Sequence, residues 1–147
     1  MTAPPLRVLV LCTGNKVRSQ MAEAFLQRAG GGRVAVSSAG THPSTVSPLT
    51  VKVLAERGFD WSGARSKSLS EFLGQPFNLV VTVCDDAREA CPVFPGAQRQ
   101  IHRPFRDPIW AAGSEDERLR EFRSVRDEIE AWAGELAADL LAEADAG

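Results

Sequence analysis

The stretch Leu6-Arg-Val-Leu-Val-Leu-Cys12-Thr-Gly-Asn-Lys-Val-Arg18-Ser19 decides the fold. Residues 6–12 are almost continuously apolar, which is typical of a strand buried on both faces of a parallel sheet. Thr13-Gly14-Asn15 interrupts the run, and a helix with one apolar face is expected from Ser19 to the glycines at 30–32. A buried strand, a tight loop and a helix N-terminus therefore follow one another.

The rest of the chain repeats this alternation of strands and helices. Further strands are expected at 33–38, 77–83 and 97–101, and helices from Ser47-Pro48 to near Gly58 and over 119–140, behind a Ser114–Glu117 capping box. The pattern predicts an α/β fold, a three-layer sandwich with a four-stranded parallel sheet, flavodoxin-like in its topology. Ligands of such sheets bind beyond the carboxyl ends of the strands, so we expect the chemistry there.

Composition narrows the class of protein. The 147 residues are 44% hydrophobic and 24% charged, which predicts one globular domain over residues 1–147. A net charge of -2 argues against a general nucleic-acid binder, and no apolar run approaches the ~20 residues of a membrane span. The first residues do not resemble a signal peptide, so a cytoplasmic protein is expected. Three cysteines are too few for a secreted disulfide scaffold.

Cys12 and Arg18 flank the loop between the first strand and the first helix. Backbone N–H groups of such a loop can bind a tetrahedral oxyanion, and the arginine can hold two of its oxygens. The positive field favours a thiolate at Cys12, to which Ser19 can donate a hydrogen bond. The alternative is that Cys12 is a buried, unreactive thiol. The expected oxyanion-binding residues are Thr13, Gly14, Asn15, Lys16, Val17, Arg18 and Ser19.

Two more cysteines, Cys84 and Cys91, follow the third strand. Cys84 ends that strand, so it is expected on the same sheet edge as Cys12. In a helix, the offset from Cys84 to Cys91 spans about 10.5 Å, and a disulfide needs Cα atoms within about 7 Å. The pair can bond only if its segment is looped or unwinds; two buried thiols are the alternative. No metal site is expected, because the cysteines, His42 and His102 lack metal-ligand spacing.

Asp107-Pro108 follows the fourth predicted strand. A carboxyl group on this loop can reach the same sheet edge and act as a general acid. Asp-Pro is also an ordinary turn dipeptide, so a structural turn is the alternative. Neither His42 nor His102 is assigned a role.

Taken together, these segments resemble a known family. They are Cys12-Thr-Gly-Asn-x-x-Arg-Ser-Gln-Met-Ala-Glu23, Ser38-Ala39-Gly40, Ser66-Lys67-Ser68-Leu69, Val81-Thr-Val-Cys84, Cys91-Pro92 and Asp107-Pro108. In this order they resemble the thioredoxin-coupled arsenate reductases, which are built on the low-molecular-weight tyrosine phosphatase fold. The resemblance runs from about Val8 to Ile129.

The resemblance implies a mechanism for arsenic detoxification. Cys12 attacks arsenate held by the loop and Arg18, and Asp107 protonates the departing oxygen. Cys84 attacks the Cys12 sulfur and releases arsenite, and Cys91 then moves the disulfide to Cys84–Cys91. The implied partners are the substrate arsenate and thioredoxin as external reductant. No bound cofactor, nucleic acid or membrane is implied, and a monomer is expected.

Two positions depart from the family pattern. Lys16-Val17 stands where many relatives have Ser-Cys, and Lys67 stands where some relatives place an acidic ligand of a monovalent cation. The Lys67 ammonium is expected to replace that cation, which predicts no potassium requirement.

Two other functions fit part of the pattern. A low-molecular-weight protein tyrosine phosphatase would use Cys12, Arg18 and Asp107 and hydrolyse its phosphocysteine intermediate with water. That family places aromatic residues, often tyrosines, after the Asp-Pro, whereas this chain has no tyrosine and continues with Ile109-Trp110. Such an enzyme would also leave the two extra cysteines unexplained, although weak residual phosphatase activity is compatible with the loop. The second is a non-catalytic oxyanion-binding module.

Overall fold

A four-stranded parallel sheet forms the centre of the protein. The structure, a computed structural model, describes residues 3–85 and 93–146. The strands lie in the order β2-β1-β3-β4, which is the flavodoxin-like order, so the predicted fold class is confirmed. They are β1 (Leu6–Cys12), β2 (Val34–Gly40), β3 (Leu79–Thr82) and β4 (Gln100–His102).

Strand β1 is central, and both of its faces are covered. It pairs with β2 along its whole length and with β3 over Val8–Leu11. Val8 and Val10 face one apolar cluster, whereas Leu9 and Leu11 face the other. The continuous apolar run of residues 6–12 therefore has a simple cause, because every side chain after Arg7 enters a core.

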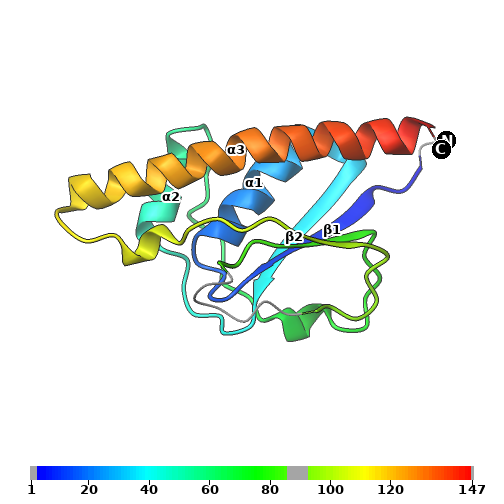
Figure 1. Cartoon of the computed structure of the whole chain (residues 1–147), viewed down its shortest axis with the longest axis horizontal. Helices are drawn as coiled ribbons and strands as arrows, with labels where there is room; N and C mark the ends of the chain where they lie inside the picture. Colours follow the sequence, from blue (N-terminus) through cyan, green and yellow to red (C-terminus); the bar gives the residue numbers. More distant parts are fainter. Residues whose placement is uncertain (1–2, 86–92, 147) are drawn as a thin grey trace.

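The two faces of the sheet carry unequal layers (Figure 1). The helices α1 (Arg18–Gly30), α2 (Pro48–Ala55) and α3 (Glu115–Ala146) pack into one apolar cluster with Val8 and Val10. In the described chain the opposite face is covered by the short 3-10 helix η2 (Leu69–Phe72) and by Phe77 and Phe94, whose rings meet at 5.6 Å. Two further 3-10 turns are η1 (Gly31–Arg33) and η3 (Pro108–Trp110).

The helix starts follow the predicted capping chemistry. Ser47 accepts from the Leu49 N–H, with Pro48 in the first turn of α2. Ser114 and Glu117 form the predicted reciprocal capping box of α3, each side chain accepting from the other residue's N–H. Among the described residues, no helix combines the length and apolarity that a membrane crossing requires.

Several boundaries differ from the predictions. Strand β4 spans Gln100–His102 rather than 97–101; it is an edge strand whose exposed side chains give little pattern. Helix α3 starts at Glu115, as the capping box predicts, but it continues to Ala146, beyond the apolar repeat that ends at Leu140, because apolar periodicity reports only the face that is buried.

The buried Arg126 joins α3 to the end of α2. Its side chain is 4% exposed, and it donates to the Val53 carbonyl and, at 2.6 Å, to the Glu56 carboxylate. Arg123 donates to the same carboxylate at 2.7 Å. Hydrogen bonds from Arg123 and Arg126, together with their charges, lower the pKa of Glu56 from 4.5 to about 2, against the effect of burial.

Glu56→Gln is expected to lower the free energy of unfolding at pH 7 by about 1–3 kcal/mol, because buried Arg126 loses one of its two charged partners and keeps Asp127. A lowered pKa contributes stability above the ordinary value of 4.5, and this contribution is lost as the pH falls toward 2. Urea unfolding should therefore give a parent–variant difference that shrinks between pH 4.5 and 2. Glu143→Gln, which removes an exposed partner of Arg99, is the control and should cost under about 1 kcal/mol. Equal stability of parent and Glu56→Gln at pH 7 would contradict the prediction.

Candidate active site

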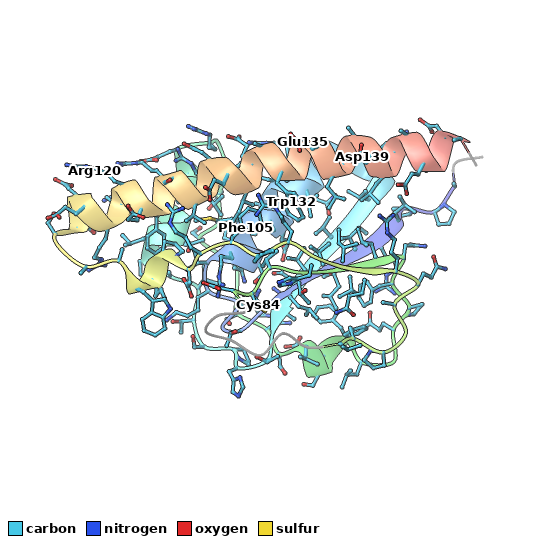
Figure 2. All side chains as sticks on the ribbon, viewed as in Figure 1. Cys84, Phe105, Arg120, Trp132, Glu135 and Asp139 are labelled. Atoms are coloured by element: carbon cyan, nitrogen blue, oxygen red, sulfur yellow. The ribbon has the colours of Figure 1, made fainter. Side chains whose placement is uncertain are left out.

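Cys12 and Cys84 end neighbouring strands at the carboxyl edge of the sheet. Cys12 is the last residue of β1, and Cys84 lies two residues beyond β3, in the register Leu11↔Thr82. Both are buried free thiols, and the Cys84 Sγ lies 3.9 Å from the Leu11 carbonyl oxygen (Figure 2). The predicted relay residue Cys91 lies outside the described residues.

The loop after β1 has its carbonyl groups bound on the outside. Each of these oxygens accepts a hydrogen bond from another part of the chain, an arrangement that suits an anion-binding nest of loop N–H groups. The donors, in order from the Cys12 carbonyl to the Val17 carbonyl, are Thr41 N, His42 N, Ser44 N with Ser66 Oγ, Gln20 Nε2, Ser47 N with Thr50 Oγ1, and Met21 N.

Gly40 permits this loop to lie against β2. A Cβ at this position would overlap the Thr13 carbonyl oxygen and crowd the Asn15 N–H. Gly40 also donates its N–H to the Lys67 carbonyl, so three segments of the chain meet here. The glycine is required by close backbone approach.

The N-terminus of α1 is left available to an anion. Its N-cap, Val17, offers no side-chain acceptor, and its first turn contains no acidic residue. The first N–H groups of a helix have no partner within the helix, and together with the helix dipole they favour negative charge at this point. Ser19 places its Oγ 2.9 Å from the Cys12 Sγ, so the predicted contact between them is present.

Arg18 connects the loop to the segment that carries Asp107. Its buried guanidinium donates to the Phe105 carbonyl at 3.2 Å and to Asp107 Oδ2 at 3.2 Å. The Phe105 ring packs edge-on against Trp132 of α3 at 5.5 Å, which fixes this segment from behind (Figure 2). Asp107 Oδ1 also accepts from Ile109 N at 3.0 Å and caps η3. Asp107 thus caps a turn and also forms an ion pair with Arg18.

Glu23, a partly buried acid, lies behind the loop. Burial raises the pKa of Glu23 from 4.5, while the Ser38 hydroxyl, which donates at 2.6 Å, and the Lys67 charge oppose the rise. The Lys67 ammonium lies 3.8 Å from the Glu23 carboxylate. At this position the Lys67 ammonium can balance the negative charge of Glu23, as a bound cation would. Independence of potassium stays a prediction.

The remaining residues singled out in the sequence have structural contacts. Lys16 is half-buried and Val17 is buried in the core. His42 donates its backbone N–H to Thr13, and His102 on the edge strand lies 2.7 Å from Thr82 Oγ1. In the described ranges no group of three or more His, Cys, Asp or Glu side chains could hold a metal ion.

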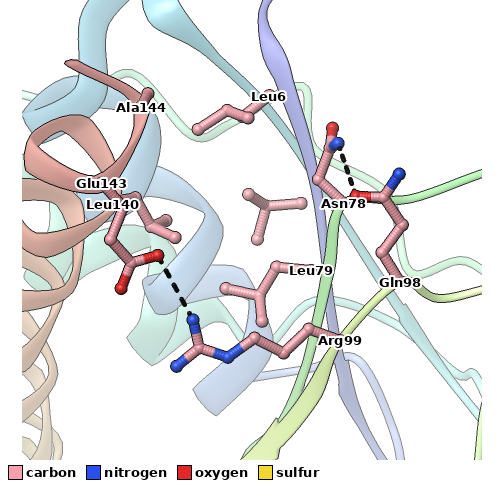
Figure 3. Close-up of a pocket in the computed structure, with 9 residues that line it drawn as sticks. Leu6, Asn78, Leu79, Gln98, Arg99, Leu140, Glu143 and Ala144 are labelled. Carbon is pink, nitrogen blue, oxygen red and sulfur yellow. Dashed lines mark hydrogen bonds and ion pairs between the residues drawn. The ribbon is translucent and has the colours of Figure 1, made fainter. Parts of the chain in front are cut away.

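A cavity of about 480 Å³ opens beside Asp107. Its walls include Arg106, Pro108 and the exposed Trp110. Another cavity, of about 390 Å³, lies at the amino ends of the strands, where Leu6, Leu79 and Leu140 form its apolar wall and Arg99 pairs with Glu143 (Figure 3). That cavity is at the wrong end of the sheet for the Cys12 chemistry.

Sequence reasoning found the residues inside the loop and missed those that support it. Gly40 and Ser66 occur in segments quoted for the family resemblance, but nothing local assigns them a contact with the loop. Gln20 also stands in a quoted segment without an assigned contact, and Trp61, whose indole donates a hydrogen bond to it, gave no signal. Such contacts join residues far apart in the chain, so no local pattern predicts them.

The comparisons with known proteins agree with this geometry. A family model described as low molecular weight phosphotyrosine protein phosphatase matches residues 7–146. An arsenate reductase of Halalkalibacterium halodurans is 41% identical over 122 residues, covering 83% of this chain and 88% of that protein.

Two solved structures are also similar. The arsenate reductase of Archaeoglobus fulgidus is 27% identical with a TM-score of 0.75, covering 89% of this chain and 98% of that one. A thioredoxin-dependent arsenate reductase of Corynebacterium glutamicum is 26% identical with a TM-score of 0.72, covering 97% of this chain and 65% of that one.

Gly40→Ala is expected to weaken binding of a tetrahedral oxyanion at least about tenfold, because the new methyl group displaces the loop carbonyl and the N–H groups that depend on it. Isothermal titration with inorganic phosphate measures the effect. Gly63→Ala is the matched control, since a Cβ there meets nothing within 4 Å. Unchanged phosphate affinity in a folded Gly40→Ala protein would refute the role given to this close contact.

Proposed function

The chain belongs to the low molecular weight phosphotyrosine protein phosphatase family, in the group that includes curated arsenate reductases, and we propose that it reduces arsenate to arsenite for arsenic detoxification. The proposed route is a relay of Cys12, Cys84 and Cys91, with thioredoxin as the final reductant. Arsenate is a tetrahedral oxyanion, the shape that the loop between β1 and α1 is built to accept.

One observation carries the redox part of the proposal. The Cys84 sulfur lies against the Leu11 carbonyl, next to the residue that bears the Cys12 thiol. Hydrolysis of a phosphate ester needs no second thiol, whereas As(V) must receive two electrons to become As(III). Two cysteines at one sheet edge supply these electrons by forming a disulfide.

The first step is nucleophilic substitution at arsenic. The Cys12 thiolate, which can accept a hydrogen bond from Ser19, attacks arsenate bound by the loop N–H groups and Arg18. A sulfur–arsenic bond forms and one oxygen departs. Asp107, paired with Arg18 beside the cavity, supplies the proton, so that the oxygen leaves as water.

The following steps move electrons and then restore the enzyme. The Cys84 thiolate attacks the Cys12 sulfur, the sulfur–arsenic bond breaks toward arsenic, and arsenite leaves with the electron pair. Cys91 then attacks Cys84, which frees Cys12 and gives a Cys84–Cys91 disulfide. Thioredoxin reduces this disulfide by thiol exchange. The thioredoxin-dependent relative supports this choice of reductant.

No bound cofactor takes part in this scheme, because one dithiol supplies the two electrons that arsenate requires. The protein is proposed to act as a single domain over residues 1–147, as a cytoplasmic monomer. Its partners are then arsenate and thioredoxin, and neither a nucleic acid nor a membrane is needed.

Thiol counting separates this function from its two rivals. A phosphatase returns every thiol to its starting state, and an oxyanion-binding module never consumes one. With arsenate and no reductant, the reductase should lose two thiols per protein and release one arsenite. Cys12→Ser should lose none, because a hydroxyl cannot replace an activated thiolate. Near-normal arsenate turnover by Cys12→Ser with thioredoxin would overturn the proposed function.

Replacing the other two cysteines tests the order of the relay. Cys91→Ser should release one arsenite and stop as a Cys12–Cys84 disulfide, so multiple turnover with thioredoxin should be largely lost. Cys84→Ser should stop earlier, with arsenic held on Cys12. Mass spectrometry of tryptic peptides identifies each trapped species. Equal multiple-turnover rates for Cys91→Ser and the parent would remove Cys91 from the mechanism.

A further inference from the structure

A second loop closes the back of the oxyanion loop. Residues 60–67 provide the Ser66 hydroxyl, which donates to the Gly14 carbonyl at 2.7 Å, and the Lys67 N–H, which donates to Asn15 Oδ1 at 2.9 Å. They also provide Trp61, whose indole N–H donates to Gln20 Oε1 at 2.9 Å. Gln20 is fully buried and does not touch the enclosed side where substrate is proposed to bind. Its role in the proposed reaction is therefore indirect.

The groups around Gln20 fix which end of its amide carries the hydrogens. An indole N–H can only donate, so the atom facing Trp61 is the oxygen. The nitrogen at the other end meets the Asn15 carbonyl at 3.2 Å and the Arg65 carbonyl at 3.1 Å, which can only accept. The Gln20 amide therefore donates toward Asn15, and its Nε2 also donates to Asn15 Oδ1 at 2.9 Å.

The same reasoning fixes the amide of Asn15. Its oxygen receives donors from both Gln20 and the Lys67 N–H, so its nitrogen faces the opposite way. That nitrogen donates to Ser19 Oγ at 2.7 Å and to Ser38 Oγ at 2.9 Å. Ser38 in turn donates its proton to Glu23. Asn15 has a φ of +50°, a strained backbone that asparagine tolerates better than most residues and that these contacts hold in place.

Ser19 therefore accepts from Asn15 and keeps its own hydroxyl proton for the Cys12 sulfur, 2.9 Å away. We propose that Gln20, oriented by Trp61, is a positioning residue that makes Ser19 a donor to the Cys12 thiolate. The hydrogen bonds run from Trp61 through Gln20, Asn15 and Ser19 to Cys12, and each is donated in the direction from the indole toward the sulfur. If the Asn15 amide turned over, Ser19 would donate to the amide oxygen and the thiolate would lose a hydrogen bond.

The proposal rests on the proposed function only in taking Cys12 as the nucleophile, and its test needs no arsenate. Alkylation of Cys12 by neutral iodoacetamide, followed over pH by mass spectrometry of the Cys12 peptide, reports the thiolate directly. The charged groups near this series of hydrogen bonds are unchanged in every variant. They are Arg18, Asp107, Glu23 and Lys67. Failure of arsenate reduction and failure of this proposal are therefore separate results.

Gln20→Met retains the volume of the side chain and removes all of its hydrogen bonds. The pH midpoint of Cys12 alkylation should rise by about half a unit to one unit, a three- to tenfold loss of rate below the midpoint, because one net hydrogen bond to the thiolate is lost. Gln27→Met is the matched control. Gln27 lies on the same helix and likewise donates to two carbonyls and accepts one N–H, but at the far end of α1.

Trp61→Phe gives a second measurement, because it retains an aromatic ring beside Phe59 and removes the indole N–H together with one ring of the indole. It should raise the midpoint in the same direction by less than Gln20→Met does, while Gln27→Met leaves it unchanged. Midpoints of Gln20→Met and Trp61→Phe equal to that of the parent would overturn the proposal. If Gln20→Met does not fold, an unchanged midpoint in Trp61→Phe is sufficient to overturn it.

Discussion

The hydrogen bonds that hold the carbonyl oxygens of residues 12–17 outward are the constraint on which the rest of the site depends. A loop that turned one of these carbonyls inward would put a partial negative charge where an oxyanion must bind. The donors come from the segment after β2, from α1, from the start of α2 and from the loop at 60–67. The sheet order explains why they can reach, because β2 is the direct neighbour of β1 and delivers its following loop to the same edge.

With the loop fixed, burial strengthens the electrostatics of the site. Arg18 is 2% exposed, so its charge acts in a poorly screened surrounding and its pairing with Asp107 is held in one geometry. Asp107 is partly exposed, at 17%, and lines the cavity beside the site. The ion pair therefore joins a buried cation to a carboxyl group that solvent can reach.

The sequence predicts what depends on local patterns. The apolar run of residues 6–12 identified β1 with its observed bounds, and the pairing of a strand end with a helix start identified the candidate oxyanion loop. Cys84 is expected beside Cys12 because parallel strands end at one edge, and in the structure the Cys84 Sγ lies against the carbonyl of Leu11, the residue before Cys12. Edge strand β4 starts later than expected, because its exposed side chains give little pattern. No local pattern assigns Gly40, Gln20 or Trp61 its contacts, because these depend on the folded chain and not on neighbours in sequence.

Whether the proposed enzyme is a reductase or a phosphatase depends on which nucleophile, water or a second thiol, attacks after Cys12 has reacted. Both chemistries need the same loop, the same arginine and an acid on the Asp107 segment, so none of these residues decides between them. A hydrolase must admit water to the intermediate, whereas a reductase must bring a second sulfur to the first. A strand neighbour is well suited to the second task, since paired strands run roughly 4.8 Å apart and the register fixes their ends. The thiol of Cys84 is fully buried at the end of such a strand and lies against the β1 backbone. A buried thiol in that position does nothing for hydrolysis, whereas in the proposed relay it supplies the electrons that reduction requires.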